Sequence, residues 1–237
     1  MAQDPTSARE FMKAALQDHG WTEHSQMTVL ADGADGLKRV VQGAVPEEPR
    51  NILDWLHISM RLRPIEQMGP NLADVLGEVD AGTAAAIRVK LPRLRYQMWR
   101  GKWAAAIERM RDLYRSAGAV IESLRTLDAE DAERVGRFRQ HLVSLRDYLK
   151  NNWSSLTNYG HLHRHGRRIS SAPAESGMTH LVNQRMGKRQ PMCWSREGAH
   201  LLLQVRCAML DCRLDARFRE LYPQFRQTPA AVQLPVL

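Results

Sequence analysis

Two short apolar runs each end in an aspartate, at Asp32 and at Asp54. The first run, "MTVLADGADGL" at 27–37, is apolar up to Asp32 and then rich in glycine, and the second, "NILDWLH", rises in the same way to Asp54. Such runs are typical of buried strands, and acids at strand ends lie where α/β proteins bind ligands. An alternative is that Asp32 or Asp35 only caps a helix expected from about Leu37.

A third acid, Glu175, stands near the end of a loop expected over 151–177, where a helix begins. Carboxylates of this kind bind Mg²⁺ together with phosphate oxygens and water. Two such ions can activate the attacking oxygen and stabilise the leaving oxygen at a phosphodiester. Because acids at the ends of helices and strands are common, the spacing alone does not establish this chemistry.

The charge of the chain favours an anionic partner such as nucleic acid. Among 237 residues there are 34 Lys and Arg against 26 Asp and Glu, which gives a formal net charge of +8 and a pI of about 9.8. A basic excess on this scale is typical of phosphate contact. It is concentrated in the final third, in Arg164, Arg167, Arg168, Arg185, Lys188, Arg189, Arg196 and Arg206.

The motif "HLHRH" at 161–165 allows two interpretations. On a strand the three histidines would share one side and could bind a metal, but the neighbouring arginines would repel the cation, so phosphate contact or a solvated loop is the alternative. The chain contains no G-x-S-x-G, P-loop or G-x-G-x-x-G motif, which weakens the hydrolase and nucleotide-binding classes.

The remaining composition predicts a cytoplasmic protein with no membrane segment. No apolar run approaches the roughly 20 residues of a membrane span, and the polar start "MAQDPTSARE" does not resemble a signal peptide. The three cysteines lack C-x-x-C spacing, so we expect reduced thiols and neither a disulfide framework nor a zinc site.

The order of the expected elements indicates an α/β fold with a helical insertion. Residues 1–57 read as helix, strand, helix and strand, with a capping box at "SARE" from Ser7, which suggests a parallel strand pair. Apolar residues at three- and four-residue spacing over 58–150 predict an all-helical segment. Residues 151–226 then form a basic loop and helices, one of them capped by Ser195, and we expect 227–237 to be disordered.

Three blocks of sequence resemble the transposases of the ISKra insertion-sequence family. They are "VLADGADGLKRVV", "NILDWLHISMRLR" and "NYGHLHRHGRRISSAPAESGMTHLVNQRMGKRQPMCWSREGAHLLLQVR", and the resemblance extends from about Glu10 to Arg226. The family consists of DDE recombinases with an RNase H-like core. The resemblance therefore implies an α/β RNase H-like core, incomplete at its N-terminal side and interrupted by an all-helical insertion.

The resemblance also implies roles for individual residues. Asp32 matches the second catalytic aspartate and Glu175 the closing glutamate, which together hold Mg²⁺ or Mn²⁺, while Asp54 and His57 match a supporting D-x-x-H motif. The implied reaction uses water to free a 3′ end, and that 3′ hydroxyl then attacks target DNA. The residues expected to contact DNA phosphates are Arg167, Arg168, Arg185, Lys188 and Arg189.

The implied partners are the inverted-repeat ends of a transposon and its target DNA, bound by a homo-oligomer associated with the nucleoid. In related enzymes such insertions hold DNA ends, so Trp99 or Trp103 could stack on an unpaired base, with packing in the core as the alternative.

Two departures from the family pattern bear on activity. The chain reads "ESGMTHLV" where the family has Glu-Ser-Thr-Val-Asn, and only 31 residues precede Asp32, with Asp4 and Asp18 as the sole early aspartates. We therefore expect a truncated transposase that lacks the first catalytic aspartate. The alternatives are a catalytically inactive DNA-binding remnant, or an unrelated basic helical protein that binds RNA.

Overall fold

The computed structural model describes residues 5–77, 80–123, 129–183, 186 and 193–224. The chain forms two compact units, Met1–Ser171 and Ala172–Leu237, and each is described by itself below.

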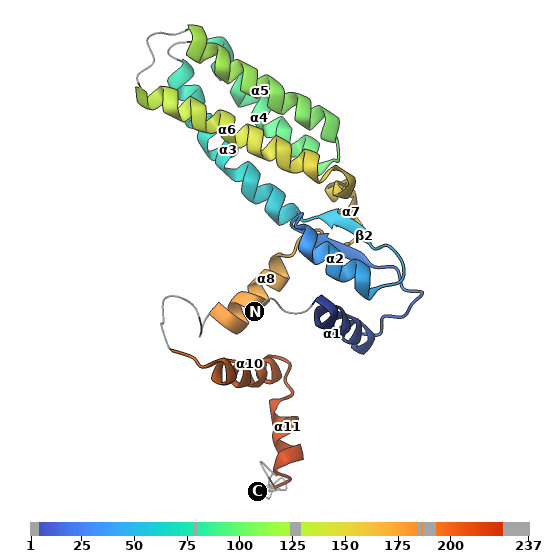
Figure 1. The fold of residues 1–237 in the computed structure, drawn as a ribbon. Helices are drawn as coiled ribbons and strands as arrows, with labels where there is room; N and C mark the ends of the chain where they lie inside the picture. Colours follow the sequence, from blue (N-terminus) through green and yellow to red (C-terminus); the bar gives the residue numbers. More distant parts are fainter. Residues whose placement is uncertain (1–4, 78–79, 124–128, 184–185, 187–192, 225–237) are drawn as a thin grey trace, which may run out of the picture. The chain divides into compact units, whose positions relative to one another are not determined.

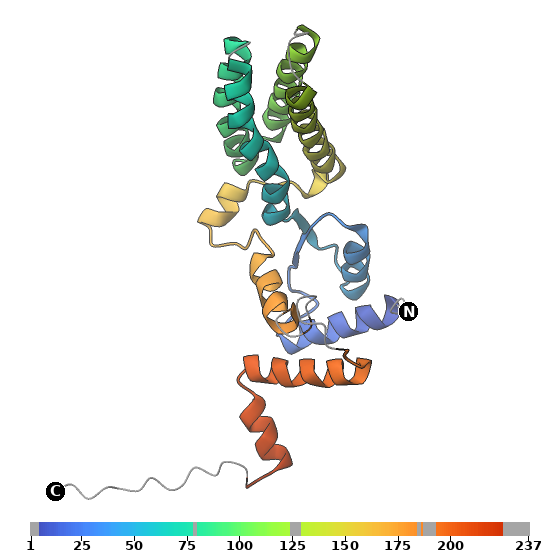
Figure 2. The same cartoon turned by 90° about the vertical axis from the view of Figure 1, so that its left-hand side faces the viewer.

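The first unit is built on four long helices: α3 (Trp55–Gly77), α4 (Ala81–Trp99), α5 (Trp103–Ser123) and α6 (Ala129–Asn151). Figures 1 and 2 show these helices side by side, with α6 packed against both α3 and α5. Apolar residues at three- and four-residue spacing form their shared core, which confirms the helical prediction for this segment. On α6 these residues are Val135, Phe138, Leu142, Leu145 and Leu149.

Local contacts fix the ends and the alignment of these helices. Asp80 caps α4, because its side chain accepts hydrogen bonds from the N–H groups of Gly82 and Thr83. Between α3 and α4, the guanidinium of Arg95 donates two hydrogen bonds to the carboxylate of Glu66, at 2.6 and 2.7 Å. These contacts hold α4 in register against α3.

A small parallel sheet lies where α3 begins. Strands β1 (Thr28–Ala31) and β2 (Arg50–Leu53) are joined by α2 (Asp35–Ala44), and α1 (Pro5–Asp18) packs against α2. The two strands are parallel, as predicted, with Thr28 paired to Arg50 and Ala31 paired to Leu53. Strand β2 passes through a single residue, Asp54, into α3.

The predicted α/β RNase H-like core is wrong. In the described part of the chain, strands are confined to β1 and β2, and most of the remaining residues are helical. The buried core consists mainly of residues from α3 to α6, with Ile52 and Leu53 of β2 joined to it. The helical segment is therefore the principal core of this unit and is not an insertion into a larger sheet.

Two local expectations also need correction. Helix α1 begins at Pro5, so Ser7 lies inside the helix and does not cap it. The loop expected over 151–177 contains the 3₁₀ helix η1 (Trp153–Ser155), α7 (Tyr159–Arg164) and most of α8 (Ala172–Met178). Asn158 begins α7 by accepting a hydrogen bond from the N–H of His161.

The second unit is helical. After α8 come the π-helix η2 (Thr179–Asn183), α10 (Arg196–Leu210) and α11 (Leu214–Leu221). Ser195 caps α10 as predicted, because its hydroxyl accepts a hydrogen bond of 3.0 Å from the N–H of Gly198. Arg206 links α10 to η2 by donating to the carbonyl oxygens of His180 and Leu181. The tail expected over 227–237 lies outside the described residues.

Among the helices that the structure describes, none is both long and apolar enough to cross a membrane.

Candidate active site

Asp32 and Asp54 lie next to each other at one edge of the sheet. Because β1 and β2 are parallel and Ala31 pairs with Leu53, each aspartate is the first residue after its strand. The backbone N–H of Asp54 donates a hydrogen bond of 2.9 Å to the carbonyl oxygen of Ala31 and extends the pairing by one step. The two acids therefore occupy the carboxyl ends of parallel strands, where ligands bind in sheets of this kind.

The carboxylate of Asp54 is fully buried and accepts several hydrogen bonds. Its Oδ1 accepts from the N–H of Leu56 at 2.9 Å, and its Oδ2 accepts from the hydroxyl of Ser171 and from Nδ1 of His57 at 3.0 Å. Burial by itself would raise the pKa of this carboxyl, but the donors outweigh it, with Ser171 the strongest of them, and hold the pKa below its usual value. Asp54 is therefore a buried, ionised carboxylate.

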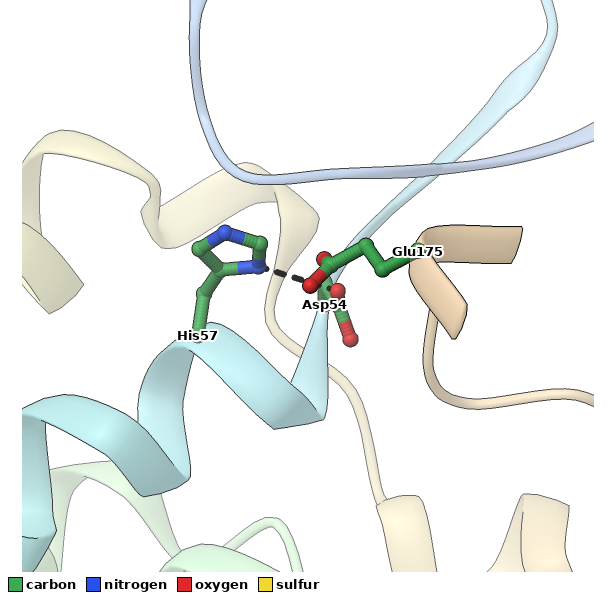
Figure 3. A group of neighbouring side chains, drawn as sticks. All are labelled: Asp54, His57 and Glu175. Carbon is green, nitrogen blue, oxygen red and sulfur yellow. Dashed lines mark hydrogen bonds and ion pairs between the residues drawn. The ribbon is translucent and has the colours of Figure 1, made fainter. Parts of the chain in front are cut away.

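His57 is oriented by Asp54 from the first turn of α3. An ionised carboxylate only accepts hydrogen bonds, so Nδ1 of His57 is the donor in this bond. Figure 3 shows the second ring nitrogen pointing away from Asp54, and 32% of the side chain is exposed. A carboxylate behind a partly exposed imidazole is typical of histidines that accept protons or bind metals.

Asp32 is exposed and belongs to a turn. Its Oδ1 accepts a hydrogen bond of 2.9 Å from the N–H of Ala34, and the next residue, Gly33, has a φ of +93°. Helix α2 begins at Asp35, and its N-cap residue is Ala34, which makes no side-chain cap. The structure thus places neither Asp32 nor Asp35 at the N-cap position.

Arg61 and Tyr148 lie beside Asp32, and we did not single them out from the sequence. The guanidinium of Arg61 lies 4.1 Å from the centre of the Tyr148 ring, and the Tyr148 hydroxyl donates to the carbonyl oxygen of Asp32 at 2.9 Å. Burial raises the pKa of Tyr148, which keeps it a hydrogen-bond donor. The sequence feature that could have identified Arg61 is its position four residues after His57, which places the two residues on the same face of α3.

The other predicted residues are distributed over both units. Glu175 lies in the first turn of α8 in the second unit and is exposed. Arg167 and Arg168 are exposed in the segment of the first unit that precedes Ser171. The structure does not describe the remaining predicted phosphate contacts, Arg185, Lys188 and Arg189.

The three histidines of "HLHRH" do not converge on one point. They lie on or next to α7 and not on a strand, so the middle residue faces away from the other two. The rings of His161 and His165 lie 4.2 Å apart, whereas His163 lies 5.7 Å from the ring of Trp99. A shared metal site for all three does not fit this arrangement.

No protein-family model, curated protein or solved structure matches this chain.

Proposed function

We propose that this protein is a DNA transposase that catalyses metal-dependent cleavage and transfer of phosphodiesters. The observation that supports this best is the pairing at one strand edge of an exposed acid, Asp32, with a buried and ionised acid, Asp54, that orients a histidine. We retain the transposase activity that the sequence resemblance implies, and we do not retain the RNase H-like core.

Asp32 and Glu175 are proposed to hold Mg²⁺ or Mn²⁺. Both are exposed acids, and carboxylates are the ligands that these hard cations prefer. Glu175 follows Ser171 by only four residues, and Ser171 is bonded to Asp54. The link from Ser171 to Glu175 is short, since four residues span at most about 14 Å when fully extended. Bound metal would supply positive charge to the phosphate oxygens.

The protein's own side chains supply the remaining parts of the reaction. In this proposal Nε2 of His57 takes a proton from the attacking hydroxyl, and the carboxylate of Asp54, bonded to Nδ1, stabilises the imidazolium that forms. Arg61, Arg167 and Arg168 are exposed cations suited to the DNA backbone. Transposition joins two DNA ends, so we propose that several copies of the chain assemble on the DNA.

The test measures nicking of supercoiled plasmid in Mg²⁺ by the full chain and by three variants, Asp32→Asn, Asp54→Asn and Glu175→Gln. Each variant should lose at least about 100-fold in nicking rate, because Asp32→Asn and Glu175→Gln each remove a proposed metal ligand and Asp54→Asn removes the acid that orients His57. Glu197→Gln, which changes an exposed acid on α10, is the matched control and should nick normally. Addition of EDTA should stop the wild-type reaction.

Binding measurements separate this proposal from its rivals. Fluorescence anisotropy with duplex DNA should give similar affinities for the wild type and Glu175→Gln. Duplex binding without any nicking in Mg²⁺ or Mn²⁺ would contradict the catalytic proposal and identify a DNA-binding remnant. Preferential binding to RNA, with no effect of Mn²⁺ on thermal unfolding, would contradict the transposase proposal altogether.

A further inference from the structure

Two histidines that the proposed reaction does not use lie side by side on one face of α7. His161 is in this helix and His165 is its C-cap residue, four positions later, so both side chains project from the same side. Their ring centroids are 4.2 Å apart, with an angle of 36° between the ring planes. Both residues are exposed, so an ion in solution can reach the edges of both rings.

A hydrogen bond to the backbone orients the ring of His165. Its Nδ1 lies 2.8 Å from the carbonyl oxygen of His161. A carbonyl oxygen only accepts hydrogen bonds, so Nδ1 is the donor in this bond, and in the neutral imidazole Nε2 then carries the lone pair. Histidines that bind metals are commonly oriented in this way, by a hydrogen bond from the ring nitrogen that does not bind the ion.

The backbone that carries the two histidines is anchored to the core of the first unit. Leu162, between them, is buried, and so is Tyr159 at the start of α7. Asn158 accepts a hydrogen bond from the N–H of His161, and the N–H of His165 donates to the carbonyl oxygen of His161 at 3.2 Å. The spacing of the two side chains is therefore fixed, so binding an ion needs to order little more than the two rings.

Open space beside His165 leaves room for an ion and its water ligands. Gly166 follows with a φ of +65°, and a Cβ added there would meet no atom within 4 Å. His163, the third histidine of the motif, lies against the ring of Trp99, 5.7 Å between centroids, and stays apart from the pair. A site with two histidine ligands keeps its other coordination positions for water.

The charges around α7 disfavour hard cations at this pair. Arg164, Arg167 and Arg168 are exposed and close in sequence, and their positive charge opposes the binding of any cation. Hard ions such as Mg²⁺ prefer oxygen ligands, so imidazole does little to offset this repulsion. Imidazole suits Ni²⁺, Cu²⁺ and Zn²⁺, which bond to it well. The pair therefore fits a borderline transition-metal ion and does not fit the Mg²⁺ of the proposed reaction.

We propose that His161 and His165 together bind one divalent transition-metal ion of the class of Ni²⁺, Cu²⁺ and Zn²⁺. Nε2 of His165 and one ring nitrogen of His161 contact the ion at about 2.0–2.1 Å, after rotation of the exposed rings, and water fills the other positions. Two histidines four residues apart on one helical face also bind zinc in other proteins. The inference does not depend on DNA as the substrate.

The test titrates the full chain, without an affinity tag, with Ni²⁺ and follows binding by isothermal titration calorimetry. Excess Mg²⁺ competes for carboxylates and leaves the imidazoles free. His161→Ala and His165→Ala should each weaken Ni²⁺ binding by at least about 10-fold, because even a group behind a metal ligand contributes that much. Both residues are exposed, so both variants should fold normally, which circular dichroism checks.

His163→Ala is the matched control, because His163 is an exposed histidine of the same helix that lies apart from the pair. It should bind Ni²⁺ with the affinity of the wild type. Cu²⁺ should bind the wild type more tightly than Ni²⁺ does, as the general order of affinities requires. Unchanged Ni²⁺ affinity in His161→Ala or His165→Ala would overturn the proposal, as would an equal loss in His163→Ala.

The outcomes for this pair and for the candidate active site are independent. Glu175→Gln should bind Ni²⁺ like the wild type while it loses nicking in Mg²⁺. Nicking by a chain that binds no Ni²⁺ at the pair would overturn the metal-site proposal alone. Ni²⁺ binding at the pair by a chain that does not nick DNA would overturn the proposed function and leave the site on α7.

Discussion

The hydroxyl of Ser171 donates a hydrogen bond to the buried carboxylate of Asp54, which lies 117 residues earlier in the sequence. Close by, the N–H of Trp55 donates to the carbonyl oxygen of Ile169 at 3.0 Å. Together the two bonds tie the segment that ends the first unit to the beginning of α3. A contact between such distant segments stabilises the fold and also fixes the position of an ionised group at the strand edge.

We predict that this carboxylate makes the stability of the first unit depend on pH. Because the pKa of Asp54 is lower in the folded protein, its contribution is fully present above the unfolded pKa and is lost as the pH falls through the folded pKa. At pH 6, Asp54→Asn should be less stable than the wild type by about 1–3 kcal/mol, the range for a hydrogen-bonded charged group. Urea unfolding at pH 6 and at pH 3 should show this difference shrinking in acid.

Ser171→Ala provides the control for that prediction. It removes the donor that lowers the pKa of Asp54 most, so the pH dependence of stability should weaken in this variant. A difference between Asp54→Asn and the wild type that is the same at pH 3 and pH 6 would show that the Asp54 charge does not stabilise the fold.

Three glycines of the first unit should respond differently when each is replaced by alanine. Gly33 has a φ of +93°, and an added Cβ would come within 2.5 Å of the amide oxygen of Asn152, so Gly33→Ala should cost about 2–4 kcal/mol. Gly20 has a φ of +79° with open space around it, so its variant should cost only the backbone strain, about 1 kcal/mol. Gly36→Ala, inside α2, should stabilise by about 0.5–1 kcal/mol. Thermal unfolding of the three variants should give this order, and an equal loss at Gly33 and Gly20 would exclude the contact with Asn152.

Local patterns were sufficient to predict the elements that carry the acids. Apolar runs that end in aspartate predicted β1 and β2, and the three- and four-residue periodicity predicted the long helices. Hydrogen bonding inside each segment determines these features, so they can be read from a few neighbouring residues. The cap at Ser195 was predicted for the same reason.

Features that depend on distant segments could not be predicted in this way. The sequence could not show that Asp54 is buried while Asp32 is exposed, because burial depends on where Ser171 and α6 lie. The predicted fold class was wrong because we expected the two strands to belong to a larger sheet. In the structure the apolar faces of α3 to α6 pack against one another instead.

Truncation of a leucine should affect stability strongly in the bundle and weakly in the second unit. Leu145 is fully buried on α6, so Leu145→Ala should cost about 2–5 kcal/mol through lost burial and the cavity that remains. Leu201, on α10, is 57% exposed, and Leu201→Ala should change stability by less than about 0.5 kcal/mol. Urea unfolding followed by circular dichroism distinguishes the two variants. A large loss for Leu201→Ala would show that α10 buries this face against a partner.

Arg61 should contribute one phosphate contact to DNA binding. Its guanidinium lies 4.1 Å from the ring of Tyr148, beside the carbonyl that anchors Asp32, which places a cation next to the two acids. Because each neutralised phosphate releases counterions, Arg61→Gln should lower the slope of log Kd against log salt concentration by about 0.9 on duplex DNA. Arg139→Gln is the matched control, since Arg139 lies at the same 4.1 Å from the ring of Tyr114 but joins α5 to α6. Its salt slope should equal that of the wild type. Equal slopes for all three proteins would show that Arg61 does not touch the DNA backbone and that its charge serves the fold alone.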